Sequence, residues 1–262
     1  MLFRRLVLCA LLVGILAGLF LSAVQQWKIL PLIAAAEVHE MAGVAANAAP
    51  ADAHGEHAPH AHDDAHGAAE WEPADGAERQ LWTVVANMLA ASGFALLLVA
   101  AIAGWETLSG RPGAGAANGL VWGAAGWLAV FALPALGLPP ELPGAAAAAL
   151  HERQLWWSLA VTSGAAGLAV LAFGRMPWRF LGLALIALPL AVGAPHPEVG
   201  AYSGYPADIE HEMEALAARF ALATALANAL YWLALGALSG FAVARWVRPA
   251  VAALRADAPA CA

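Results

Sequence analysis

Long uncharged stretches of mainly apolar residues alternate along the chain with shorter polar segments. A helix needs about 20 such residues to cross a bilayer, and five stretches meet that length. They predict spans at 6–26, 83–105, 119–138, 155–173 and 217–246. A sixth stretch, 177–194, is weaker because it contains Arg179 and because Pro189 would kink a helix. A re-entrant or tilted segment is the alternative there.

The composition indicates that these apolar stretches belong to an integral membrane protein. Charged residues make up 12% of the 262 residues, and the mean hydropathy is +0.68. Soluble domains carry about 25% charged residues, so a soluble fold could not cover its surface with this supply. The pattern therefore predicts an all-α, polytopic integral membrane helical bundle. It would form a single membrane domain over 1–262, with the lipid bilayer as its partner.

The positions of the charged residues distinguish six spans from five. Basic residues in short loops favour the cytoplasmic side of a membrane. With six spans and both termini cytoplasmic, eight of the twelve basic residues fall inside, whereas 17 of the 19 acidic residues and all nine histidines fall outside. Five spans, the alternative, would place the arginine-rich segment "RWVRPAVAALR" outside. We therefore expect six spans with both termini in the cytoplasm.

A cleaved signal peptide is an alternative for the first apolar stretch. Arg4 and Arg5 precede it, and "AAAEV" further along resembles a cleavage site. The apolar core of such signals is about 7–15 residues long. The run here is longer, and "QQWKILP" separates it from the cleavage-like segment. We therefore expect a retained span.

Several residues in or beside the predicted spans suit contacts between helices or with lipid headgroups. "GILAG" and "GALSG" are small-xxx-small patterns that let helices approach closely, although such patterns arise easily in an Ala/Gly-rich chain. Amides within the spans tie helices together or line a path; they are Gln25, Gln26, Asn87 and Asn228. Tryptophans stand near the span ends, as in interfacial belts; they are Trp27, Trp82, Trp105, Trp156, Trp157, Trp178 and Trp246.

The segment "HGEHAPHAHDDAH" is the most polar part of the chain and lies in the predicted outer loop 40–78. Its histidines are His54, His57, His60, His62 and His66, with Glu56, Asp63 and Asp64 among them. Imidazole binds Co(II), Ni(II), Cu(II) and Zn(II) well, and carboxylates assist. The flanks are small and low in aliphatic residues, which predicts disorder. We expect this loop to collect divalent metal without selecting among metals; a merely solvated loop is the alternative.

Metal binding by such a loop should depend on pH. An imidazole titrates with a pKa of about 6.5, so metal affinity should fall as the pH drops below about 6.

Two quieter clusters lie where outer segments meet predicted spans. "AEVHE" supplies Glu37, His39 and Glu40, which form either an entry site for a cation or a hydrated helix end. "GAPHPE" supplies His196, fixed between two prolines, and Glu198. Before the last span, His211 falls at helical spacing with Asp208 and with either Glu212 or Glu214. The alternative for His211 is the solvated first turn of a helix, which acidic residues suit.

Familiar catalytic and nucleotide-binding motifs do not occur in the sequence. It contains no G-x-x-x-x-G-K-[ST], H-E-x-x-H, G-x-S-x-G or C-x-x-C pattern. The two cysteines, Cys9 and Cys261, are not expected to pair. We therefore expect no enzymatic activity, no cofactor and no nucleic-acid partner. The proline-rich segment "LPALGLPPELPG" predicts a rigid outer cap in which Glu141 is the only charge.

The order of several segments resembles the CbtA family of predicted cobalt transporter subunits. These segments include "QQWKILPLIAAAE", "WEPADGAERQLWTVVAN", "LPALGLPPELPG", "GAPHPE" and "ARFALATALANALYW", and together they cover nearly the whole chain outside the histidine-rich loop. The resemblance implies a prokaryotic inner-membrane protein linked to cobalamin supply, and a small one-span, histidine-bearing partner, CbtB. Members of the family are usually described with five spans. The family supplies cobalt as the metal, but no site residues that can be transferred to this chain.

These observations predict a membrane subunit for uptake of a divalent metal; the resemblance implies cobalt, and nickel, zinc or copper are the alternatives. The histidine-rich loop would lie on the outer side and collect the ion. A homo-oligomer is compatible with the sequence. Two other functions fit the same residues: a metal exporter or resistance permease, and a non-transporting metal sensor, buffer or assembly subunit.

Overall fold

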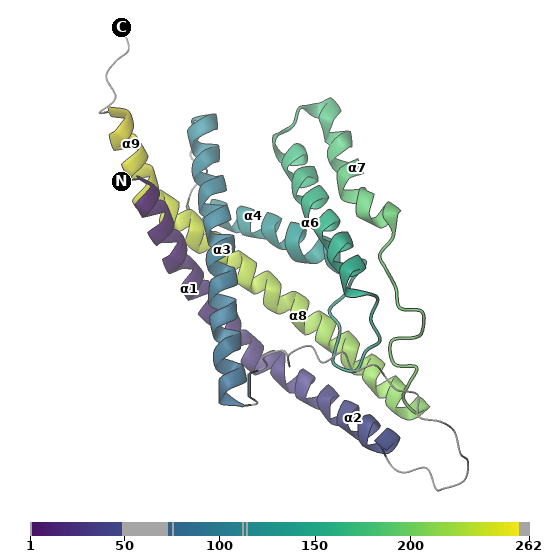
Figure 1. Cartoon of the computed structure of the whole chain (residues 1–262). Helices are drawn as coiled ribbons and strands as arrows, with labels where there is room; N and C mark the ends of the chain where they lie inside the picture. The colour runs from purple at the N-terminus through teal and green to yellow at the C-terminus, as the bar shows by residue number, and fades with distance from the viewer. Residues whose placement is uncertain (1, 49–72, 75, 112, 114, 257–262) are drawn as a thin grey trace, which may run out of the picture.

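A computed structural model describes residues 2–48, 73–74, 76–111, 113 and 115–256. All regular secondary structure in these residues is helical (Figure 1). The helices are α1 (Leu2–Lys28), α2 (Leu30–Ala48), α3 (Ala77–Ser109), α4 (Ala116–Trp127), α5 (Leu133–Ala135), α6 (Leu150–Phe173), α7 (Met176–Val192), α8 (Ala207–Ala242) and α9 (Arg248–Ala256). Two short π-helical segments, η1 (Leu128–Ala132) and η2 (Val243–Val247), join α4 to α5 and α8 to α9.

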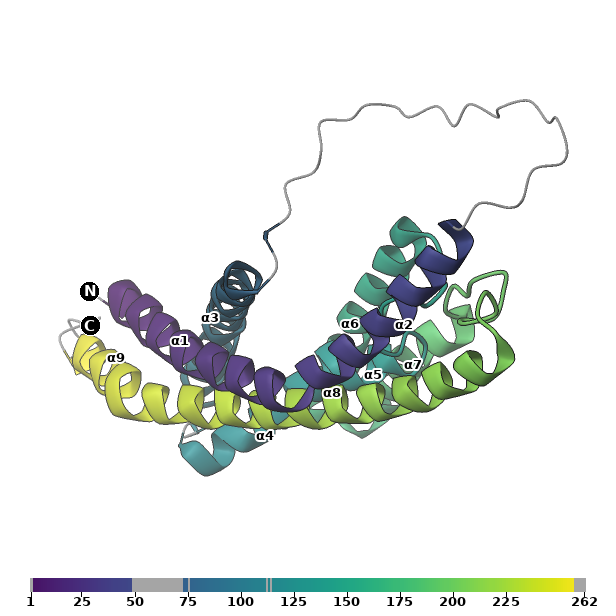
Figure 2. The same cartoon turned by 90° about the horizontal axis from the view of Figure 1, so that it is seen from below.

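Five helical stretches are long and apolar enough to cross a membrane. They are Leu2–Lys28, Ala77–Ser109, Ala116–Ala135, Leu150–Phe173 and Ala207–Leu254. These match the five stronger predicted spans and confirm the all-helical membrane architecture. The weaker sixth prediction, 177–194, corresponds to α7, a shorter apolar helix that continues through Pro189. The last span is much longer than the predicted 217–246, because α8, η2 and α9 form one continuous rod (Figure 2).

Basic and acidic residues lie mainly at opposite ends of the bundle. The start of α1, the α3–α4 turn, the α6–α7 turn and α9 lie toward one end, which we name the basic end (Figure 1). The segments 136–149 and 193–206, together with α2 and the first turns of α3 and α8, lie toward the other, which we name the acidic end. The expected segregation of charge therefore coincides with the spatial arrangement of the helices.

Close glycine contacts explain which helices pair. A Cβ at Gly14 or Gly18 of α1 would overlap the α3 backbone at Ser92 or Met88. In the same way, Gly236 and Gly240 of α8 face Gly119 and Gly123 of α4, a pair of helices held backbone to backbone. Both small-xxx-small patterns singled out in the sequence therefore lie at helix interfaces, as small residues do in membrane bundles.

The predicted helix-tying amides divide into two kinds. Asn87 of α3 donates from Nδ2 to Ser22 Oγ at 3.0 Å and to Gln25 Oε1 at 2.6 Å, and so ties α3 to α1. Asn228 donates only within its own helix, to the Thr224 carbonyl at 3.0 Å. The expectation of a tie between helices is therefore confirmed for Asn87 but not for Asn228.

The α6–α7 pair is an antiparallel hairpin (Figure 1). Gly167 and Gly182 bring its two helices together. Trp156, expected at the membrane interface, is buried instead, and its indole N–H donates to the carbonyl of Pro189 at 3.1 Å. That bond ties the two helices beside the proline that was expected to weaken α7.

The outer segment after α1 contains more helix than expected. We predicted a disordered loop over 40–78, but α2 continues through Ala48 and α3 begins at Ala77. Pro31 stands at the second position of α2, where a helix does not need its N–H. The apolar side of α2 joins a second core at the acidic end, which includes Ile29, Ala36, Leu142, Met213 and Phe220. The core residues of this segment lie between 29 and 36, and the helix continues beyond them into the part that local composition predicted as disordered.

Candidate metal-binding site at the acidic end

The second core positions the first predicted cluster against the start of α8. Helix α2 carries Glu37, His39 and Glu40, and its buried Ala36 packs in the same core as Met213 of α8. This contact places His39 Nε2 3.7 Å from Glu212 Oε1. The His39 side chain is 21% exposed and the Glu212 side chain 64% exposed. Two side chains of types that bind metals, far apart in the sequence, are therefore neighbours between α2 and α8.

The spacing of this His39–Glu212 pair suits a shared cation. Imidazole nitrogen and carboxylate oxygen bind first-row divalent metals at about 2.0–2.2 Å. Two such ligands on one ion stand about 3–3.5 Å apart, so a small side-chain rotation would suffice. Without metal, the same pair is an ion pair whenever the imidazole is protonated.

Glu37 has a different partner. Arg79, in the first turn of α3, donates from Nη2 to Glu37 Oε1 at 3.0 Å. Both side chains are partly exposed. The bond connects α2 to α3 across the acidic end, so Glu37 as observed serves to hold two helices.

Glu40 lies where α2 meets the proline-rich segment. A Cβ at Gly144 would touch both the Tyr205 hydroxyl and the Glu40 side chain. Gly144 has a positive φ of 79°, which further favours glycine there. Neighbouring Tyr202 is buried, and burial raises the pKa of its hydroxyl, with nearby Glu141 and Tyr205 adding to the rise. The predicted cap thus closes onto α2 and the 193–206 segment, which it also joins through Ala146 N–H to the Ala201 carbonyl at 2.7 Å.

The other predicted ligands are not gathered here. His196 and Glu198 are exposed in the segment between α7 and α8. His211 is 89% exposed and lies 3.9 Å from Glu214 of its own helix. Within the described residues, no group of three or more His, Cys, Asp or Glu side chains could hold a metal ion. The five histidines of 54–66 lie outside the described residues.

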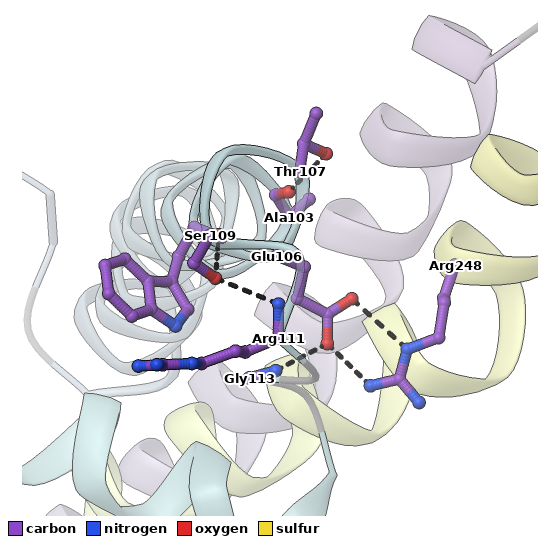
Figure 3. Close-up of polar contacts among 8 residues, drawn as sticks. Ala103, Glu106, Thr107, Ser109, Arg111, Gly113 and Arg248 are labelled. Atoms are coloured by element: carbon purple, nitrogen blue, oxygen red, sulfur yellow. Dashed lines mark hydrogen bonds and ion pairs between the residues drawn. The ribbon is translucent and has the colours of Figure 1, made fainter. Parts of the chain in front are cut away.

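A carboxylate at the opposite, basic end is held much more firmly. Arg248 of α9 donates to Glu106 of α3 from Nε at 3.2 Å and from Nη2 at 2.6 Å. The backbone N–H of Gly113 donates to the same carboxylate at 2.8 Å (Figure 3). The Glu106 side chain is only 11% exposed. This contact fixes α3, the α3–α4 turn and α9 together.

The sequence did not reveal Arg79 and Arg248 as partners of Glu37 and Glu106, and it left the role of Glu212 undecided. Arg79 and Arg248 were counted only as charges on one side of the membrane, and Glu212 was considered only as an alternative to Glu214 beside His211, where the structure places Glu214. One signal was available for Glu106, because it and Asp257 are the only acidic residues on the arginine-rich side. No periodicity within one helix indicates a partner 142 positions away.

Comparison with known proteins gives one match. The family model described as "Probable cobalt transporter subunit (CbtA)" matches residues 3–244. No curated protein and no solved structure gave a significant match to the chain.

Proposed function

The chain belongs to the CbtA family of probable cobalt transporter subunits, and from this premise we propose that it takes up Co(II) across the cytoplasmic membrane of a prokaryote to supply cobalamin synthesis. The family assignment and the five apolar helices support a membrane subunit of a cobalt transporter. A subunit implies a partner, and we propose the small one-span CbtB protein. The role is transport rather than catalysis.

We propose six crossings with both termini cytoplasmic. The start of α1 and α9 lie toward the same end, which supports an even number of crossings, and α7 runs back from the basic to the acidic end (Figure 1). Its 17 residues would span about 26 Å at 1.5 Å per residue. A hydrocarbon core of about 30 Å can thin to accept such a helix.

Two single-cysteine variants test this topology, each in a background where Cys9 and Cys261 are replaced. Arg175→Cys lies in the exposed α6–α7 turn and Ser203→Cys in the exposed segment before α8. In intact cells, a membrane-impermeant maleimide should label Ser203→Cys and not Arg175→Cys. Equal labelling of the two would show that α7 does not cross.

The observation that carries a metal role for the acidic end is the His39–Glu212 pair. We propose that these two side chains form a transient docking point for the ion. Glu37, Glu40, His196 and Glu198 are proposed to supply further contacts around it. The histidine-rich tract, through His54, His57, His60, His62 and His66, would concentrate metal outside the membrane and deliver it to this mouth.

The inward movement needs no nucleotide. The membrane potential contributes about 2.3 kcal/mol per charge per 100 mV, which acts twice on a divalent ion. Between the two ends the path would use amides, backbone carbonyls or residues of the partner subunit.

Uptake of radiolabelled Co(II) into cells that lack other cobalt importers tests the function. We expect accumulation that requires both this chain and its partner, and that falls when the membrane potential is dissipated. Faster loss of preloaded Co(II) would indicate export. Surface-bound metal with no change in internal Co(II) would indicate a sensor or buffer.

The histidine-rich loop is tested separately. Deletion of 55–67 should raise the Co(II) concentration needed for half-maximal uptake several-fold and leave maximal uptake largely unchanged. Replacement of the five histidines by glutamine is the matched control for loop length and should reproduce the effect. Complete loss of uptake in both variants would place the loop in the path itself.

A further inference from the structure

A cavity of about 640 Å³ opens between the α4–α5 span and α6 at the acidic end. One wall is apolar and comes from Val130, Phe131 and Leu138, and Leu150 and Trp157 of α6 continue it. Leu150 is 66% exposed and Trp157 42% exposed, so the cavity opens toward the outside of the bundle. In a membrane protein, the outside of the helical bundle faces lipid.

The irregular helix before the cap forms this hollow. The segment η1 is π-helical, and Pro134 is the second residue after it. Proline has no N–H for the preceding turn, and a π-bulge adds an extra residue to a turn, so both displace a helix from a regular course. The hollow is therefore set by the sequence of the α4–α5 span.

Two opposite charges stand at the rim of this cavity. Arg153 of α6 donates from Nη2 to Glu141 Oε2 at 2.7 Å, and each side chain is 30% exposed. Arg153 Nε is buried and has no hydrogen-bond partner among the described residues. A guanidinium has five donors in a planar fork that matches phosphate as well as carboxylate. The rim thus has a guanidinium with an unused donor beside a carboxylate that can accept from an amine.

We propose that this cavity binds a phospholipid whose head carries both a phosphate and a primary amine, as phosphatidylethanolamine does. An acyl chain would lie along the apolar wall. The phosphate would accept from Arg153, and the ammonium group would donate to Glu141. The cavity has an amphipathic lining, it opens toward lipid, and it carries paired charges at its rim. These three features fit a zwitterionic amphiphile better than a soluble ion. The site is independent of the cobalt function.

Native mass spectrometry of the detergent-purified full chain tests the proposal, with phosphatidylethanolamine, phosphatidylglycerol, diacylglycerol or inorganic phosphate added. We expect retained phosphatidylethanolamine, binding about tenfold tighter than phosphatidylglycerol and tighter still than diacylglycerol. Inorganic phosphate should not displace the lipid. Equal retention of all three lipids, or binding of phosphate alone at the same site, would overturn the proposal.

Variants assign the two rim charges. Arg153→Gln should weaken phosphatidylethanolamine binding about tenfold or more, whereas Glu141→Gln should abolish the preference over phosphatidylglycerol and keep binding of both. A purely structural ion pair would instead give the same result for both variants. Arg79→Gln and Glu37→Gln are matched controls, because they form the other partly exposed Arg–Glu pair at this end and do not line the cavity.

A last variant keeps both rim charges and fills the wall. Ala135→Leu adds bulk to a residue that lines the cavity and should reduce retention of every phospholipid. Unchanged retention in Ala135→Leu would contradict the site even if Arg153→Gln did not fold.

Discussion

The two ends of the bundle use carboxylates in opposite ways. At the basic end, Glu106 is nearly buried and accepts three hydrogen bonds, two from Arg248 and one from Gly113. At the acidic end carboxylates are more numerous, but their contacts are single and partly exposed, as in Arg79–Glu37, or long, as in His39–Glu212. A carboxylate held by three donors has little capacity left for a cation. A carboxylate with one weak partner can exchange that partner for an incoming ion.

The carboxylate at the basic end therefore has a structural role, whereas those at the acidic end can exchange their partners. Breaking a buried ion pair costs several kcal/mol, whereas an exposed pair contributes about 0–1 kcal/mol. The basic end should therefore respond to mutation through stability, and the acidic end through metal handling.

The largest effect should come from the glycine contact that joins the long α8 rod to α4. Gly236→Leu would force its side chain into the backbone of Gly119 and Gly123. We expect a loss of about 3 kcal/mol or more of unfolding free energy, measured as a fall in melting temperature in detergent. Gly204→Ala is the control, since nothing lies within 4 Å of a Cβ there. Equal melting temperatures for the two variants would contradict the close packing of α4 on α8.

The next effect tests the contrast between the ends directly. Glu106→Gln leaves Arg248 without its charged partner at a largely buried contact, and we expect a loss of about 2 kcal/mol of unfolding free energy. Glu37→Gln, which weakens the exposed pair with Arg79, should lose about 1 kcal/mol or less. Thermal unfolding of both proteins in one detergent measures the difference. The contrast fails if Glu37→Gln is the more destabilising of the two.

A smaller effect is expected from the polar tie between α1 and α3. Asn87→Ala removes the donor shared by Ser22 and Gln25. Hydrogen bonds between membrane helices contribute about 0.6–1.7 kcal/mol, so the melting temperature should fall modestly. Asn228→Ala is a matched control, because Asn228 bonds only within its own helix. A larger fall for Asn228→Ala would show that the tie between helices adds nothing.

Much of the fold follows from local sequence. Runs of about 20 uncharged residues indicate spans whatever their partners, and Gly14, Gly18, Gly236 and Gly240 mark faces that can approach another helix. The glycines of α4 that receive Gly236 were not singled out, because a pattern on one helix does not name its counterpart. The helical form of 40–48 was missed because the small residues there indicated disorder, whereas the structure continues α2 beyond its packed residues 29–36.

The candidate site was harder to predict from the sequence than the fold. "AEVHE" identified His39, but Glu212 lies on a distant helix and was considered only as a neighbour of His211, so the pair could not be recognised until α2 was placed on α8. His196 stood out between two prolines, yet the structure leaves it exposed and apart from His39. Local chemistry thus located candidate ligands, and only tertiary packing brought two of them together.

The central claim is that the acidic end receives metal at the His39–Glu212 pair. Initial rates of radiolabelled Co(II) uptake, measured for His39→Gln and for His211→Gln in cells that contain the partner subunit, test it most directly. His211 is the matched control, because it is next to Glu212 in α8 but is 89% exposed and has its ion-pair neighbour, Glu214, on its own helix. The account predicts a several-fold lower rate for His39→Gln at limiting Co(II), with normal protein levels, and a near-normal rate for His211→Gln. Equal rates for the two variants would contradict it.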